Sequence, residues 1–116
     1  MVTAKAKFIS RRLREKYGVV GKVAERYISA GYSVTFNVKC NDVLFDFIAK
    51  KGEKIGVKIY NGKIKVGLED IEKISRAAEK LGVKPVIVLY GSGPSVSEEA
   101  LDKADELNIS IKRIRP

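Results

Sequence analysis

The chain has 116 residues, of which 45% are hydrophobic and 32% charged, and its formal net charge is +9. This composition predicts one globular domain over residues 1–116 with a hydrophobic core of its own. No apolar run approaches the roughly 20 residues of a membrane span, and residues 1–16 lack the apolar stretch of a signal peptide. We therefore expect a cytoplasmic protein with no membrane partner. A single Cys40 and the absence of histidine exclude an internal disulfide and a zinc cluster.

The charge is unevenly placed along the chain. Residues 1–65 hold 15 Lys and Arg against 5 Asp and Glu, whereas residues 66–116 hold 8 against 9. A basic half beside a neutral half makes an oriented field that attracts polyanions, so nucleic acid is the favoured partner. The alternative is a solvated, lysine-rich thermophile surface, which the absence of glutamine also fits. That alternative does not account for the asymmetry.

Two helices are predicted at the start of the chain. Residues 4–17 carry apolar side chains at helical spacing among Arg and Lys, which is typical of a basic amphipathic helix. This helix could either contact DNA or cap the core with its basic face in solvent. A second helix is predicted over residues 20–30, and Gly31 ends it.

Three strand-like runs follow, at residues 32–38, 43–49 and 54–60. Turn residues at Asn41-Asp42 and at 50–52 separate these runs, which predicts an antiparallel meander. Asn61-Gly62 is a strong hairpin dipeptide, so residues 63–66 are expected to fold back on the third strand.

The remainder alternates helices and strands. Apolar spacing predicts a helix over residues 68–81 that ends at Gly82. Residues 85–90 form a nearly continuous apolar run, typical of a strand covered on both faces. Ser97 begins a last helix, and residues 109–114 form a last strand. This order predicts an α/β fold, a mixed sheet with helices on both faces.

The most informative segment reads Asp46-Phe-Ile-Ala-Lys-Lys-Gly-Glu-Lys-Ile-Gly-Val-Lys58-Ile-Tyr60. An acid ends one strand, a tight turn follows, and the next strand carries Lys58 and Tyr60. Residues two apart on a strand share a face, so these two side chains are expected to point into one cleft with Asp46. A strand aspartate that simply pairs with Lys58 would carry the same charges.

The element order and the residues at its joints resemble the PD-(D/E)XK nuclease superfamily, and small archaeal Holliday junction resolvases and RecB- or Mrr-like domains in particular. The likeness covers residues 18–114 and rests on Ala24-Glu25-Arg26 before a helix-ending glycine, on Leu44-Phe-Asp46-Phe-Ile-Ala, on Ile55-Gly-Val-Lys58-Ile-Tyr60 and on the closing strand–helix–strand. It implies a restriction-endonuclease-like αβββαβ core with an extra N-terminal helix, residues 1–17, and a C-terminal helix and strand. Archaeal tRNA-splicing endonucleases share this core, but their catalytic histidine has no counterpart here.

In that superfamily two acids hold Mg²⁺, and a lysine positions the attacking water. Carried over by position, Glu25 and Asp46 would be metal ligands, Lys58 replaces the second acid and Tyr60 replaces the lysine. An ammonium group repels a divalent cation, and a phenol carries no positive charge at neutral pH. The resemblance therefore implies a degenerate pseudo-site of Glu25, Asp46, Lys58 and Tyr60 that holds no metal.

The favoured function is a catalytically inactive, nuclease-fold protein that binds duplex or branched DNA, with a role in DNA repair or recombination. One alternative is a Mg²⁺-dependent, structure-selective endonuclease in which Lys50, Lys63 or Lys65 and Asp42 replace the missing groups. Another is a homodimer, or a silent partner of a nuclease-like paralogue, in which residues 85–90 and 109–114 contribute to the interface. The candidate phosphate contacts are Lys5, Lys7, Arg11, Arg12, Arg14, Lys22, Lys50, Lys51, Lys63 and Lys65.

Overall fold

The computed structural model describes residues 18–115. The helix predicted at residues 4–17 lies outside them, and with it Lys5, Lys7, Arg11, Arg12 and Arg14. In chain order the described elements are α2 (Val19–Ser29), β1 (Ser33–Cys40), β2 (Val43–Lys51), β3 (Glu53–Asn61), β4 (Lys65–Val66), α3 (Leu68–Leu81), β5 (Lys84–Tyr90), β6 (Ser95–Val96), α4 (Glu98–Glu106) and β7 (Ser110–Ile114). None of these helices is long and apolar enough to cross a membrane.

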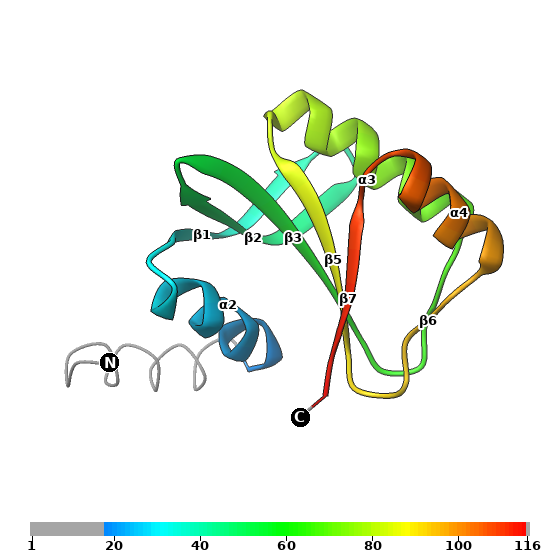
Figure 1. The fold of residues 1–116 in the computed structure, drawn as a ribbon, viewed down its shortest axis with the longest axis horizontal. Helices are drawn as coiled ribbons and strands as arrows, with labels where there is room; N and C mark the ends of the chain where they lie inside the picture. The colour runs from blue at the N-terminus through cyan, green and yellow to red at the C-terminus, as the bar shows by residue number, and fades with distance from the viewer. Residues whose placement is uncertain (1–17, 116) are drawn as a thin grey trace.

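A five-stranded mixed sheet forms the centre of the fold, in the order β1-β2-β3-β5-β7. The strands β1, β2 and β3 pair as an antiparallel meander, and β3, β5 and β7 run parallel. Helix α2 lies against one face of the sheet, and α3 and α4 cover the other (Figure 1). The predicted α/β fold is thus confirmed.

Two hydrophobic cores lie on the two faces of the sheet. On the α2 face, Val23 and Ala24 of the helix pack against Phe47, Val57 and Val88. On the other face, the apolar sides of α3 and α4 pack against residues such as Phe45, Ile87 and Leu89. Strand β5 contributes to both cores, as its continuous apolar run predicts.

The helix boundaries follow the predicted signals. Gly82 ends α3 in the left-handed conformation at φ 69°, which glycine adopts without a steric penalty. The Ser97 hydroxyl accepts a hydrogen bond from the Ala100 N–H at 3.2 Å and so caps α4.

Two expectations about pairing are wrong. Residues 63–66 do not fold back on β3; instead β4 pairs in parallel with β6 in a separate two-stranded sheet. The end of β3 has no free edge for a hairpin partner, because it pairs with β5 on one side and receives a side chain from β2 on the other. The β2–β3 turn is also tighter than predicted, since Lys50 and Lys51 belong to the ladder and only Gly52 lies between the strands.

The predicted contribution of residues 85–90 to a subunit interface is limited to the two ends of the strand, where Pro85 and Tyr90 are partly exposed. Strand β5 lies between β3 and β7 and is covered by both helical layers, so four of its residues, Val86, Ile87, Val88 and Leu89, are buried. β7 has a neighbouring strand on one side only, within the described part of the chain.

The hairpin of β1 and β2 changes faces in its middle. On β2, Phe47 packs on the α2 face, whereas Phe45, two residues away, packs on the α3 face. Simple alternation would place both on one face. The change occurs at Asp46, and its neighbour on β1 is Asn37, which has the left-handed φ of 54°. The hairpin thereby packs against both helical layers.

Gly56 of β3 packs closely against Phe45 of β2 and against Val83, which follows α3. A Cβ built there would lie 2.8 Å from Val83 Cγ2 and 3.1 Å from the Phe45 ring. We expect Gly56→Ala to lower the free energy of unfolding by about 1–3 kcal/mol, the usual cost of overpacking, as measured by urea denaturation.

The double variant Gly56→Ala/Val83→Ala should be less destabilised than the sum of the two single variants, because the second change removes the atom that the new methyl meets. Strict additivity would contradict this packing.

Candidate functional site

Asp46 lies where β2 and β3 separate. The ladder between these strands ends at the pair Phe47↔Val57. Beyond it, the Ile59 N–H donates to Asp46 Oδ2 at 2.6 Å, so a carboxylate takes the place of a strand carbonyl. The pKa of Asp46 is raised because the carboxyl group is desolvated by burial, although the Ile59 hydrogen bond and the charge of Lys58 act to lower it. The carboxylate is thus held in a fixed position at a cost in solvation.

Lys58 and Tyr60 lie beside Asp46, on the α3 face of β3. Tyr60 packs against the core of that face, and residues two apart on a strand share a face. The Lys58 ammonium lies 5.5 Å from the centroid of the Tyr60 ring, within cation–π range. Burial, together with the negative charges of Asp70 and Asp46, raises the pKa of Tyr60 to about 12. Tyr60 therefore stays a neutral phenol at physiological pH.

Asp70 belongs to this neighbourhood, although the sequence did not single it out. It lies in the first turn of α3, and its Oδ2 accepts a hydrogen bond from the Gly67 N–H at 2.9 Å. Its spacing from Gly67 is the signal of a helix cap. Its effect on Tyr60 depends on the packing of α3, which local sequence does not reveal.

Glu25 lies on the opposite face of the sheet. It lines a hollow with Lys22, Arg26 and Tyr90 on the α2 side, whereas Lys58 and Tyr60 lie on the α3 side. The structure thus brings together Asp46, Lys58 and Tyr60, and it does not gather Glu25 with them.

These residues do not fit a divalent metal ion. Mg²⁺ prefers oxygen ligands, usually carboxylates, whereas the strand residue that precedes Ile59, the partner of Asp46, is a lysine. Over residues 18–115, no three Asp, Glu, Cys or His side chains form a group suited to a metal. The substitute acid considered for an active enzyme, Asp42, acts electrostatically on Lys73 of α3.

The predicted basic contacts within residues 18–115 fall at two ends of the sheet. Lys50 and Lys51 flank the turn before β3, and Lys63 and Lys65 follow its last residue. Nine strand residues separate these ends by roughly 26 Å. Lys51 also donates to the Ala30 carbonyl at 2.7 Å and lies over the Tyr32 ring, so it has a structural partner.

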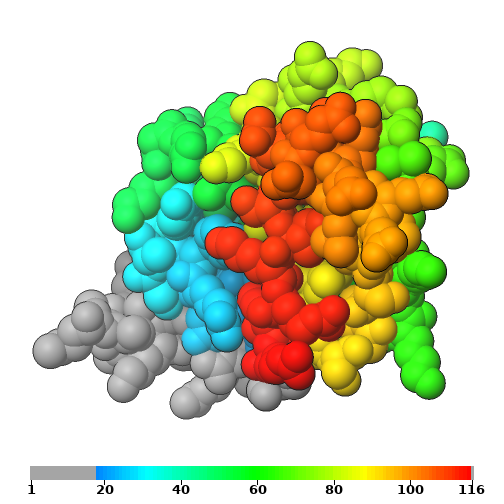
Figure 2. Space-filling view, turned by 45° about the vertical axis from the view of Figure 1, so that its right-hand side comes forward, coloured from blue at the N-terminus to red at the C-terminus, as the bar shows by residue number. Residues whose placement is uncertain are grey.

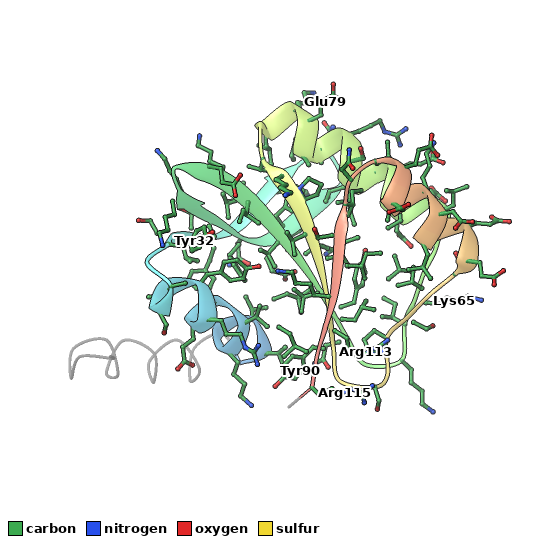
Figure 3. All side chains as sticks on the ribbon, in the orientation of Figure 1. Tyr32, Lys65, Glu79, Tyr90, Arg113 and Arg115 are labelled. Atoms are coloured by element: carbon green, nitrogen blue, oxygen red, sulfur yellow. The ribbon has the colours of Figure 1, made fainter. Side chains whose placement is uncertain are left out.

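Lys22 lies on α2, beside the carboxyl ends of β5 and β7. Figure 3 shows Tyr90 and Arg115 at this end of the sheet. Sequence reasoning did not select Arg26, Tyr90 or Arg115, because they are far apart along the chain and meet only when the parallel strands align.

The hydrogen bond of Asp46 predicts different outcomes for two substitutions. The raised pKa means that the folded state holds the proton more tightly than the unfolded state, so the charged form costs stability once the pH exceeds the ordinary value of 3.8. In Asp46→Asn the amide oxygen can still accept from Ile59, so we expect a melting temperature a few degrees above wild type at pH 7 and equal to it below pH 3.8.

Asp46→Ala leaves the Ile59 N–H without its acceptor and should lose about 1–3 kcal/mol at every pH. Asp102→Asn, on the exposed surface of α4, is the control. Thermal unfolding monitored by circular dichroism from pH 3 to 8 measures all four proteins. Equal stability of the Asn and Ala variants would contradict the role of this hydrogen bond.

Comparison with known proteins finds solved structures with a similar fold. No protein-family profile and no curated protein sequence matches the chain. Among solved structures, a protein of unknown function aligns with a TM-score of 0.61 and 21% identity over 78% of this chain and 54% of its own. A repair endonuclease from Pyrococcus abyssi aligns with a TM-score of 0.59 and 16% identity over 100% of this chain and 49% of its own.

A complex of EndoMS with dsDNA aligns with a TM-score of 0.52 and 12% identity over 100% of this chain and 47% of its own. The chain thus spans about half the length of the solved structures that it matches. At these identities the likeness concerns the fold alone. The chain has a restriction-endonuclease-like mixed α/β fold, as its sequence predicts.

Proposed function

We propose that this protein binds nucleic acid, with DNA as its partner, through a nuclease fold whose Asp46 site no longer supports metal-dependent hydrolysis. The observation that carries the proposal is that Lys58 directly precedes Ile59, whose N–H holds the Asp46 carboxylate, and that the positive charge of Lys58 acts on this carboxylate. A tethered cation there opposes the entry of a divalent ion by direct repulsion.

Two observations support DNA as the partner. The net charge is +9, and positive charge of this size supplies sequence-independent affinity for phosphates. Two of the structures that share the fold are a repair endonuclease and a complex with dsDNA.

The hydrolytic alternative needs an acid in place of Lys58 and a lysine in place of Tyr60. Two of the lysines named for these roles belong to other parts of the fold. Lys50 pairs with Lys54 near the β2–β3 turn, and Lys65 lies in the separate sheet of β4 and β6. We therefore favour binding without cleavage, in a role in repair or recombination. A homodimer or a nuclease-like paralogue could supply the catalytic partner.

Binding and cleavage are measured on the same substrates. Fluorescence anisotropy with duplex DNA and with a four-way junction should show binding whose logarithm falls linearly with the logarithm of salt concentration. Incubation of the same DNAs with Mg²⁺ or Mn²⁺ should leave them intact on denaturing gels. Products that require the divalent ion and vanish in Asp46→Asn would instead establish the endonuclease alternative.

Lys58→Glu tests whether the ammonium excludes a metal. The change places a second carboxylate opposite Asp46, and paired carboxylates are suitable ligands for Mg²⁺ or Mn²⁺. We expect Mn²⁺ uptake by this variant in isothermal titration calorimetry. Lys58→Gln is the matched control, because it removes the cation without adding an acid. Mn²⁺ uptake by the wild type, or none by Lys58→Glu, would argue against this role of Lys58.

A further inference from the structure

A hollow lies between α2 and the carboxyl ends of β5 and β7. Its volume is about 240 Å³, room for several water molecules at about 30 Å³ each, and so for a hydrated phosphate group. The lining residues are Lys22, Val23, Glu25, Arg26, Tyr90, Ile114 and Arg115. Tyr90 and Ile114 are direct neighbours in the ladder between β5 and β7, so the floor of the hollow belongs to the rigid sheet.

The charge of this hollow is positive. Three cations, Lys22, Arg26 and Arg115, line it together with one carboxylate, that of Glu25. The ion pairs formed within residues 18–115 are Lys73–Glu69 and Lys103–Glu106, and neither includes these cations. All three are exposed, so their charges act on solvent and on solutes.

Two of these cations repel each other along α2. Lys22 and Arg26 are four residues apart on the helix, and like charges at this spacing destabilise a helix by about 0.2–0.5 kcal/mol. A second hollow continues along the same stripe and is lined by Lys22, Glu25, Arg26 and Ser29. An anion bound between the two side chains would attract both of them and so offset their repulsion.

The chemistry of the lining suits a phosphodiester. Guanidinium groups donate two parallel hydrogen bonds to phosphate oxygens, and a lysine adds a point charge. The Tyr90 hydroxyl can donate a further hydrogen bond. Figure 2 shows β7, in red, beside α2, in blue, on the surface turned toward the viewer.

We infer that this hollow, formed by Lys22, Arg26 and Arg115 around Tyr90, binds the phosphates of a nucleic-acid backbone. The inference rests on the proposed function and locates its binding surface. It moves the main contacts from the basic N-terminal half alone to a junction of α2 with the C-terminal strand.

The basic residues at the other end of the sheet serve less well. Lys51 is held by the Ala30 carbonyl and the Tyr32 ring. Lys50 and Lys54 line a different hollow, and most of its other lining side chains are uncharged, among them Val38, Ile48, Leu81 and Val83. Arg113, near Arg115, donates to the Gly91 and Pro94 carbonyls and so fixes the loop after β5.

The test compares two triple variants that lose the same charge. Lys22→Gln/Arg26→Gln/Arg115→Gln removes the cations of the hollow. The control, Arg76→Gln/Lys80→Gln/Lys84→Gln, removes three exposed cations from α3 and from the start of β5, at the opposite end of the sheet. Melting temperatures verify that both variants fold, and anisotropy with duplex DNA gives the affinity across a salt series.

We expect the hollow variant to bind about tenfold or more weakly at low salt and to lose about 3 from the magnitude of its salt slope, one for each phosphate contact. The control should change much less. An equal loss of DNA affinity in both variants, or no loss in the hollow variant, would overturn the inference that this hollow binds phosphates. The proposal that the protein binds DNA would still stand.

A second measurement keeps the hollow testable if the wild type binds no DNA, a result that would overturn the proposed function. Inorganic phosphate is titrated into the protein and followed by NMR. Saturable shifts of the amides of Lys22, Tyr90 and Arg115, absent from the hollow variant, support a phosphate site. Shifts that do not saturate, or that persist in the hollow variant, overturn it.

Discussion

The hydrogen bond from the Ile59 N–H to the Asp46 carboxylate fixes the point where the sheet divides. As far as the pair Phe47↔Val57, the backbones of β2 and β3 pair with each other in the sheet, and beyond this pair they separate. An unpaired N–H in the half-buried gap would cost about 1–3 kcal/mol. The side chain of Asp46 meets that need, which lets β2 direct its earlier residues, Val43 and Phe45, toward the α3 layer while β3 continues beside β5.

This constraint also determines what can lie next to Asp46. The carboxylate cannot move toward a ligand without giving up the Ile59 N–H, and its burial already disfavours the charged form. A nearby positive charge offsets this desolvation penalty because it favours the charged form of the carboxyl group. Lys58, on the neighbouring strand, supplies a positive charge, and its ammonium also lies within cation–π range of the Tyr60 ring. A hydrolytic site would need this same space for a metal and a second acid.

Much of the fold could be predicted from local signals in the sequence. Gly82 gave the end of α3 and Ser97 the start of α4, and the apolar pattern gave the five strands of the main sheet to within about two residues, whereas β6 was not predicted. The change of faces at Asn37 and Asp46 could not be foreseen, because Val34, Phe36, Val38 and Cys40 alternate as if β1 had one buried face throughout. The pairing of β4 was missed for a related reason. The Asn61-Gly62 turn signal is local, whereas the edge of β3 is closed by residues from β2 and β5.

The candidate site was predictable to the extent that it depends on one strand pair. Asp46, Lys58 and Tyr60 come together because a tight hairpin and strand alternation place them, and both are visible in the sequence. Glu25 was expected among them from its position before a helix end, but the face against which a helix packs depends on its whole apolar stripe.

The same limit applies to charge. A count of the charged residues in each half of the chain assigned the basic character to residues 1–65. The parallel strands, however, bring the end of the chain beside α2, the first described helix. Arg115, from the neutral half, thereby joins Lys22 and Arg26 in one hollow. The electrostatic surface of this protein follows the sheet order rather than the order of the sequence.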